Sequence, residues 1–285
     1  MVKTISILGC GWLGLSLGKH LVSLGYHVKG STTTQNKLRL LEDAGIEPYL
    51  ITLDPEVTCD FCDDFFETDI LIVDIPPGIR RHKDGSFHIQ QIESLQSRLN
   101  KTLIPFVIFI SSTSVYPDFN KSVTEQDTQG LQRGTENPLL TAEDLLLNTK
   151  NNFETTVIRF AGLYGYDRHP VRYLAGRKNL SNGDAPVNMI HRDDCVNIIT
   201  EIIQQNVRNE IFNACADKHP TRRDYYTRMA LRLELEPPAF TENTSINYKI
   251  VSNEKLKKRL NYLFKYPSPY DGEVTLHVTA NKRNS

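Results

Sequence analysis

Short runs of apolar and β-branched residues alternate, over the first 160 residues, with longer stretches in which apolar positions recur at helical spacing. The runs are TISIL, YHVKG, EPYLITL, DILIVDI, PFVIFIS and TTVIRF, and the helical stretches cover residues 14–24, 35–44, 86–101 and 138–150. Repeated strand, helix and strand favours parallel pairing through crossover helices. The chain is therefore predicted to be an α/β protein with a doubly wound parallel sheet of the Rossmann type.

The regular alternation of strand and helix patterns ends after Phe160. A segment rich in Gly, Arg and Asn, AGLYGYDRHPVRYLAGRKNLSNGD, is followed by the helical DDCVNIITEIIQQ, the strand-like EIFNAC and the helical RRDYYTRMALRLEL. We expect residues 1–162 to form a nucleotide-binding domain and residues 163–285 to form a small C-terminal substrate-binding lobe. Within that lobe, residues 187–215 are expected to fold back onto the sheet.

The composition argues against nucleic acids and membranes as binding partners. The chain has 33 Lys and Arg against 34 Asp and Glu, a formal net charge of -1, so no overall field draws it to nucleic acid or to an anionic membrane. No apolar run approaches the roughly 18 residues that a membrane-spanning helix needs. We expect a soluble protein, monomeric or homodimeric, whose anion recognition is local.

The cysteines indicate a reducing compartment. There are five, odd in number and scattered, which argues against the disulfide framework of a secreted protein and favours the cytoplasm. Cys59 and Cys62 form a single C-x-x-C. Zinc needs about four ligands, and neither a second cysteine pair nor paired histidines stand nearby. An ordinary loop without metal is expected there.

A glycine-rich turn follows the first predicted strand. Gly9, Gly11 and Gly14 form G-x-G-x-x-G at the start of a helical pattern. In such a turn the first glycine permits the tight bend, the second lets the backbone approach a pyrophosphate, and the third lets helix and strand pack closely. The sequence thus predicts a dinucleotide site, with helix N-terminal amides facing the phosphates. Its predicted contacts also include Trp12, Leu13, Pro76 and Pro77.

The end of the second strand bears on the choice of cofactor. A site that prefers NAD usually has Asp or Glu about 20 residues beyond the glycines, bound to the ribose 2'-hydroxyl. Here Ser31, Thr32 and Thr33 follow Gly30, and no acid precedes Glu42. Hydroxyl donors together with Lys37 favour NADP over NAD. Asp54, expected to close the third strand, is a candidate contact for the adenine.

Several motifs together resemble a known family. GCGWLG, SSTSVY and RFAGLYG resemble landmarks of the extended short-chain dehydrogenases/reductases, which are NAD(P)-dependent epimerases, dehydratases and reductases. GWLG, GSTTTQ, SSTSVYP, RHPVRYLAG and VNMIHRDD are similar to the atypical YeeZ-type subgroup, and the resemblance covers nearly the whole chain. It implies an epimerase/dehydratase-like fold that binds a nicotinamide dinucleotide.

The resemblance also places a reaction centre, and one pair of residues departs from it. The catalytic Ser or Thr of the family falls on Ser112, four residues before Tyr116, whereas the family's Tyr-x-x-x-Lys falls on Leu139 and Glu143, in a helix opened by Pro138. In the family, a lysine lowers the tyrosine pKa from near 10 so that the hydroxyl can relay a proton. Leucine has no proton to exchange. Either another group substitutes, or turnover is slow or absent.

The loop after Phe160 holds the candidate substitutes. Tyr164, Tyr166 and His169 are expected near the nicotinamide end of the cleft, although Tyr164 also fits a structural L-Y-G turn and His169 a loop-fixing role. His191 titrates near neutrality in its free state, but family precedent favours a buried hydrogen-bonding residue.

The same region is rich in cations. Arg168, Arg172, Arg177 and Lys178 suit a phosphorylated or carboxylated ligand such as a nucleotide sugar, with Asn188 as a further predicted contact. A solvated charged loop is the alternative.

Two functions remain open. The first is a nicotinamide-dependent oxidoreductase or epimerase/dehydratase acting on a polar, anionic substrate with Ser112 and a base not yet identified. The second is a non-catalytic protein that binds or senses NADP(H), because the Tyr-Lys pair is replaced. A hydroxyacid dehydrogenase with an all-helical lobe is disfavoured by SSTSVY and by the strand-like EIFNAC.

Overall fold

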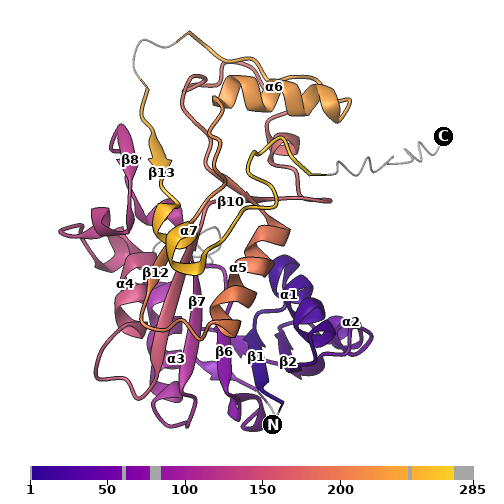
Figure 1. Ribbon diagram of the computed structural model, residues 1–285, viewed down its shortest axis with the longest axis vertical. Helices are drawn as coiled ribbons and strands as arrows, with labels where there is room; N and C mark the ends of the chain where they lie inside the picture. The colour runs from indigo at the N-terminus through magenta and orange to yellow at the C-terminus, as the bar shows by residue number, and fades with distance from the viewer. Residues whose placement is uncertain (1, 60–61, 78–84, 243–245, 273–285) are drawn as a thin grey trace.

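Seven parallel strands form the central sheet of the computed structural model, which describes residues 2–59, 62–77, 85–242 and 246–272 (Figure 1). The strand order is β12-β9-β7-β6-β1-β2-β3. The strands are β1 (Thr4–Leu8), β2 (His27–Thr32), β3 (Glu47–Leu50), β6 (Ile70–Val73), β7 (Phe106–Ser112), β9 (Glu154–Phe160) and β12 (Ile211–Ala214). The predicted α/β class and doubly wound parallel sheet are confirmed.

Helices cover both faces of this sheet. The helices α1 (Trp12–Ser23) and α5 (Arg192–Gln204) lie on one face, and α3 (Ser86–Leu99) and α4 (Pro138–Leu146) lie on the other. In β6, Ile70 and Ile72 pack with α1 and α5, whereas Leu71 and Val73 pack with α3 and α4. Burial on both faces is why these strands read as continuous apolar runs in the sequence.

The order of the strands reverses between β1 and β6. From β1 the chain moves outward through β2 and β3, and then returns to the other side of β1 with β6. The carboxyl ends of β1 and β6 therefore border the crevice in which open α/β sheets bind ligands. The glycine turn follows β1, and Asp74 follows β6, so both lie at this crevice.

The remaining elements are short. Parallel pairs join β8 (Lys121–Val123) to β13 (Lys249–Val251) and β10 (Gly162–Tyr164) to β11 (Met189–His191), while β4 (Thr52–Leu53) and β5 (Val57–Thr58) form an antiparallel hairpin. The other α-helices are α2 (Leu38–Glu42), α6 (Arg222–Arg232) and α7 (Glu254–Leu260). Short 3-10 helices are Gln35–Lys37, Asp64–Phe66, Thr113–Val115, Glu125–Thr128, Gly134–Glu136 and Pro170–Tyr173.

A small lobe lies beyond the carboxyl ends of the strands. Its core gathers Tyr164, Val187, Tyr225 and Met229, and α6 lies at the top of Figure 1, away from the central sheet. Residues 187–215, however, run through β11 and α5 into β12, the edge strand of the main sheet beside β9. The chain therefore crosses more than once between the sheet and the lobe.

The segment after α7 is fixed to α5 by one buried carboxylate. Asp194 accepts hydrogen bonds from the Tyr262 hydroxyl at 2.6 Å and from the backbone N–H groups of Lys265 at 2.8 Å and Tyr266 at 3.0 Å. Burial raises the pKa of Asp194 above its usual value of 3.8, although these three donors act in the opposite direction. This anchor connects the C-terminal segment to the central sheet through α5.

Three details differ from the sequence expectations. The strand β3 ends at Leu50, so Asp54 does not close it and lies instead, exposed, between the two strands of the β4–β5 hairpin. The helix expected over 35–44 divides into a 3-10 turn and α2, and the helix expected over 138–150 ends at Leu146. Each change shifts an end of an element and leaves the strand order intact.

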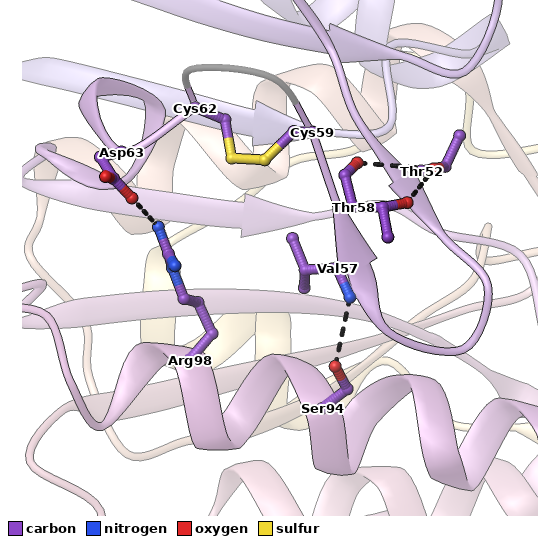
Figure 2. Close-up of a disulfide and its surroundings, with 8 residues drawn as sticks. All are labelled: Thr52, Val57, Thr58, Cys59, Cys62, Asp63, Ser94 and Arg98. Carbon is purple, nitrogen blue, oxygen red and sulfur yellow. Dashed lines mark hydrogen bonds and ion pairs between the residues drawn. A yellow bond between two sulfur atoms is a disulfide. The ribbon is translucent and has the colours of Figure 1, made fainter.

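Cys59 and Cys62 form a disulfide beside α3, so the expectation of an ordinary loop was wrong (Figure 2). Their Cα atoms lie 5.8 Å apart, a separation that a disulfide spans readily. On either side of the bridge, Val57 N–H donates to Ser94 Oγ at 3.2 Å, and Asp63 pairs with Arg98. Ser94 and Arg98 both belong to α3, so the bridged segment is held against that helix.

No helix in the part of the chain that the structure describes is long and apolar enough to cross a bilayer.

Candidate functional site

The glycine turn is built so that two of its three glycines are required by the fold. Gly9 has a φ of 108°, and a Cβ there would lie 2.2 Å from the Asp74 carbonyl oxygen. A Cβ on Gly14 would lie 2.3 Å from the Gly9 carbonyl oxygen. At Gly11, by contrast, a Cβ would meet no described atom within 4 Å. Gly11 therefore borders open space at the start of α1, where a dinucleotide pyrophosphate needs room.

The end of β2 is hydrogen-bonded to this turn. Ser31 Oγ accepts from Gly9 N–H at 2.9 Å, and the Ser31 carbonyl accepts from Cys10 N–H at 2.8 Å. Thr32 is buried, and its hydroxyl accepts from Thr34 N–H at 3.2 Å. Thr33 and Lys37 are exposed. The side chains of Ser31 and Thr32 thus shape the site from within, while Thr33 and Lys37 face solvent beside it.

The other predicted cofactor contacts fall in different places. The Leu13 side chain is buried in the core, so only its backbone is available at the turn, whereas Trp12 is half-buried. Pro76 and Pro77 lie after β6, at the crevice where the strand order reverses. Asp54 lies in the β4–β5 turn, so its predicted contact with adenine depends on a cofactor reaching that hairpin.

A cluster of rings and cations closes over Trp12. The indole Nε1 donates to Asp167 Oδ1 at 2.9 Å, and the Arg168 and Arg192 guanidinium carbons lie 5.2 Å and 4.7 Å from the indole ring. The Arg192 guanidinium carbon also lies 4.2 Å from the Tyr166 ring centroid. The loop after β10 and the start of α5 therefore meet at the N-terminus of α1. Sequence reasoning missed Asp167 and Arg192, because no motif signals a contact 155 residues from Trp12.

Ser112 and Ser111 lie at the end of β7 with different roles. Ser112 is half-buried, and its hydroxyl oxygen accepts a hydrogen bond from Ser114 N–H at 3.1 Å. Ser111 is buried and donates to Glu143 Oε1 at 2.6 Å. Neighbouring residues of a strand face opposite sides. The Ser111 side chain therefore points into the interior toward α4, and the Ser112 side chain points to the opposite face of the strand.

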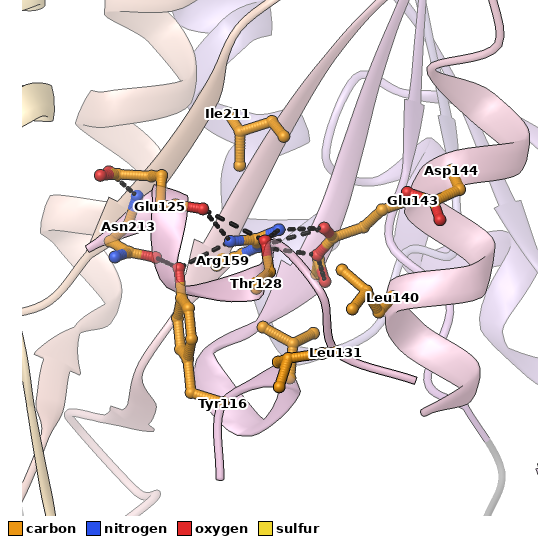
Figure 3. A network of polar contacts seen from close by, with 12 residues as sticks. Tyr116, Glu125, Thr128, Leu131, Leu140, Glu143, Asp144, Arg159, Ile211 and Asn213 are labelled. Atoms are coloured by element: carbon orange, nitrogen blue, oxygen red, sulfur yellow. Dashed lines mark hydrogen bonds and ion pairs between the residues drawn. The ribbon is translucent and has the colours of Figure 1, made fainter. Parts of the chain in front are cut away.

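The two residues that replace the family's Tyr-x-x-x-Lys lie on α4, and both are buried. Asn137 caps this helix by accepting from Leu140 N–H at 3.2 Å. Leu139 packs in the core with an exposed fraction of 8%. Glu143 accepts from Arg159 Nε at 3.0 Å and from Arg159 Nη2 at 2.5 Å, as Figure 3 shows. The position that would hold the family's lysine is therefore one end of an internal ion pair.

Arg159 extends this network to Tyr116. Its Nη1 donates to the Tyr116 hydroxyl at 2.6 Å, and that hydroxyl donates to Asn213 Oδ1 at 2.8 Å (Figure 3). Burial raises the pKa of Tyr116 to about 12, although Arg159 and Asn213 oppose the shift. Burial also lowers the pKa of Arg159, but the contacts with Glu143 outweigh it and leave that pKa above its usual value. The network joins β7, α4, β9 and β12, and its two groups with shifted pKa values, Tyr116 and Arg159, are both shifted away from neutral pH.

Of the three residues considered as substitute acid-base groups, the two tyrosines are hydrogen-bonded elsewhere and the histidine is buried. The Tyr164 hydroxyl is buried and donates to the Ser268 carbonyl at 3.0 Å, and burial raises its pKa. Tyr166 donates to Asp193, and burial raises its pKa as well. His169 is buried with an exposed fraction of 4%, which lowers its pKa.

His191 is the buried hydrogen-bonding residue that family precedent predicts. Its Nδ1 accepts from Asp193 N–H at 3.2 Å, which caps α5, and its ring lies 3.8 Å from that of Tyr266. Burial lowers its pKa to about 4. The ring is therefore neutral at physiological pH.

A pocket of about 450 Å³ lies where the lobe meets the start of β10. Its lining includes Arg168, Tyr173, Asn188, Arg222 and Tyr226. The pocket combines two guanidinium groups with phenol rings, which suits an anionic ligand that also carries a planar group.

Arg172 lies outside this pocket, and the side chain of Asn188 is already hydrogen-bonded to other residues. Arg172 is exposed and does not belong to the lining. The Asn188 amide donates to the Lys249 carbonyl at 2.8 Å and accepts from Val251 N–H at 2.9 Å, so it holds β13 in place. Of the three predicted substrate contacts, Arg168 and Asn188 line the pocket, and the Arg168 guanidinium carbon lies 5.2 Å from the Trp12 ring centroid.

The chain is similar to one curated protein over almost its full length. Protein YeeZ of Escherichia coli K12 is 35% identical over 272 residues, which cover 94% of this chain and 98% of that protein. The YeeZ protein of Escherichia coli O157:H7 matches to the same extent. No family model matches the chain.

Solved structures with low sequence identity share the fold. A conserved protein of unknown function from Silicibacter pomeroyi superposes with a TM-score of 0.72 at 19% identity, covering 94% of this chain and 95% of that one. The UDP-glucose 4-epimerase of Thermotoga maritima, solved with UDP-glucose, gives 0.73 at 15% identity over 92% and 94%. MoeE5, solved with UDP-glucuronic acid and NAD, gives 0.72 at 15% over 92% and 94%.

Proposed function

The chain belongs to the YeeZ family of atypical short-chain dehydrogenases/reductases, and from that membership we propose that it is a nicotinamide-dependent oxidoreductase or epimerase/dehydratase acting on a polar, anionic substrate such as a nucleotide sugar. The observation that supports this best is the glycine turn. Gly9 and Gly14 are required for packing, whereas Gly11 faces open space at the N-terminus of α1. This is the arrangement with which Rossmann folds bind a pyrophosphate.

The end of β2 favours NADP(H) over NAD(H). Residues 31–41 include no Asp or Glu that would repel a 2'-phosphate or bind a 2'-hydroxyl. Exposed Thr33 and Lys37 supply a hydroxyl and an ammonium group next to the turn. Both groups are donors that a phosphate accepts readily.

The pocket beside Arg168 is the proposed substrate site. Arg168 and Arg222 bring positive charge to it, and Tyr173 and Tyr226 bring rings on which a base or sugar can pack. MoeE5 and the Thermotoga maritima epimerase, which share the fold, were solved with UDP-sugars. A UDP-sugar carries a negatively charged diphosphate, which suits the arginines of this pocket, and a uracil base and a sugar ring, which suit its tyrosines.

Proton transfer on such a substrate needs a group other than the family's tyrosine. Leu139 has no ionisable atom, and Glu143 is neutralised by Arg159. Ser112 remains the polar side chain that the resemblance assigns to the substrate oxygen. We place Ser112 in that role and expect a slow reaction, because general acid-base catalysis is commonly worth about 10²- to 10⁴-fold.

A second candidate function is non-catalytic binding or sensing of NADP(H). It is favoured by one observation, the burial of both replaced residues in the core. In an enzyme that had only exchanged its acid-base group, these positions could still face the cleft. Here both residues are buried in the packing of α4, while Gly11 still borders open space in the glycine turn.

Binding is tested by titrating NADPH and NADH against the wild-type protein and Gly11→Val. We expect NADPH to bind more tightly than NADH and Gly11→Val to abolish binding at an unchanged melting temperature, because its side chain enters open space. Equal affinities would refute the NADP preference. Full binding by Gly11→Val would refute the site.

Catalysis is tested separately by incubating the protein with NADPH deuterated at C4 and a panel of nucleotide sugars and small carbonyl compounds. Transfer of deuterium to any compound supports the enzyme. A protein that binds NADPH but transfers no deuterium supports the sensing alternative.

A further inference from the structure

An acidic side chain lies inside the glycine turn. Asp74 follows β6 directly, and its carboxylate accepts a hydrogen bond from Gly14 N–H. A Cβ on Gly14 would lie 3.3 Å from Asp74 Oδ2, and one on Gly9 would lie 2.2 Å from the Asp74 carbonyl oxygen. The carboxylate is therefore held at the N-terminus of α1, beside the open space at Gly11.

Little positive charge surrounds this carboxylate among the described residues. Arg168, from the loop after β10, is the cation that acts on it. Cys10 in the turn and Cys195 on α5 also feel its charge, and burial keeps both thiols neutral by raising their pKa values, that of Cys10 to about 12. Loss of solvent raises the pKa of Asp74 from 3.8 to about 7, against the opposing effects of Gly14 N–H and Arg168.

Dinucleotide binding would bring two more negative charges to this place. The pyrophosphate lies at the helix N-terminus in every site of this type. A like charge nearby and the exclusion of water both disfavour an ionised carboxylate. Arg168 cannot offset both anions fully, since it is one cation and also lines the substrate pocket.

We propose that Asp74 takes up one proton from solvent when the pyrophosphate of a nicotinamide dinucleotide occupies the glycine turn. The proton binds a carboxylate oxygen of Asp74. Because the acid is then neutral, the positive potential of the helix N-terminus and of Arg168 acts on the phosphates alone. The inference rests on the proposed function, because it requires that the turn bind a dinucleotide. It adds that this binding is coupled to pH through a residue outside the glycine motif.

The test measures NADH binding by calorimetry between pH 6 and 8.5, in pairs of buffers with different ionisation enthalpies. NADH is the probe because it lacks the 2'-phosphate, which itself titrates with a pKa near 6. For the wild type we expect proton uptake that peaks between pH 7 and 8.5, with an affinity that falls toward tenfold per pH unit there. Asp74→Asn should take up no proton and bind NADH with a constant affinity.

The controls separate this inference from the proposed function. Glu93→Gln, which removes an exposed carboxylate on α3, should behave as the wild type does. Asp74→Ser keeps a hydroxyl acceptor for Gly14 N–H and replaces Asp74→Asn if that variant does not fold. NADH binding without proton uptake, or equal uptake in the Asp74 variants, would overturn the inference and leave the proposed function standing. No binding of either dinucleotide by the wild type would overturn both.

Discussion

The Glu143 carboxylate and the Arg159 guanidinium form a two-point ion pair in the interior, with Arg159 Nε and Nη2 both donating to it and each side chain only 1% exposed. Glu143 comes from α4 and Arg159 from β9, so the pair joins a helix to the strand beside the edge strand β12. Glu143 is the position to which the family resemblance assigns the lysine of the Tyr-x-x-x-Lys motif. An interaction that stabilises the fold thus stands where a proton relay would be expected.

Removing one partner of this pair should destabilise the protein strongly. We expect Glu143→Gln or Arg159→Met to lower the free energy of unfolding by about 3 to 5 kcal/mol, because each leaves a buried charge without its partner. Urea denaturation measures this. Asp144→Asn, next in sequence but in an exposed pair with Arg133, should cost no more than about 1 kcal/mol. Equal losses in the two variants would contradict the assigned role of the buried pair.

Restoring the family's residues should fail for the same reason. In Leu139→Tyr with Glu143→Lys, the new ammonium group would face Arg159 in the interior, and like charges at close range there are unfavourable. We expect the double variant to unfold at lower urea than the wild type, and further replacement of Arg159→Leu to recover part of the loss. A stable double variant with new dehydrogenase activity would contradict this account.

The glycines of the turn should separate folding from binding. Gly14→Ala should destabilise the protein by about 1 to 3 kcal/mol, because its Cβ meets the Gly9 carbonyl and the turn must shift. Gly11→Ala should leave the free energy of unfolding nearly unchanged, since nothing described lies within 4 Å of that Cβ. Thermal denaturation of the two variants, without ligand, measures the difference. Comparable losses would show that Gly11 also serves packing.

Ser112 should affect turnover and not cofactor binding. If a substrate is found, we expect Ser112→Ala to lower kcat/KM by an amount that corresponds to a loss of about 1.5 to 3 kcal/mol of transition-state stabilisation, the range for a hydrogen bond to a charged group. The affinity for NADPH should not change. Ser111→Ala is the matched control, because its hydroxyl donates to Glu143 and its loss should lower stability instead. Turnover unaffected by Ser112→Ala would assign β7 a structural role only.

Asp74 should also make folding depend on pH in the absence of ligand. Its pKa is about 7 in the folded chain and near 3.8 when unfolded, so the unfolded chain releases the proton first as pH rises. Stability should therefore fall between about pH 4 and pH 7 by an amount that Asp74→Asn removes. The variant should gain stability relative to the wild type at pH 8 and little at pH 4. A difference that does not vary with pH would show that Asp74 titrates normally.

Much of the fold followed from local sequence pattern. Runs such as DILIVDI are apolar at every position because strands of a parallel sheet are buried on both faces, and the glycine spacing at Gly9, Gly11 and Gly14 is set within one turn of chain. These features depend on neighbours in sequence, so the sequence by itself determined them.

The tertiary structure decided which distant groups meet. Arg159 reaches Glu143 and Tyr116 across 16 and 43 positions, Trp12 reaches Asp167 across 155, and Asn188 has its amide engaged by β13. The Asp74 carboxylate contacts the turn only because β6 lies beside β1. Periodicity encodes which face of an element is buried, but not which partner covers it. Charge pairing, desolvation and pocket lining depend on those partners, and so the chemistry of the site was fixed only when the chain was folded.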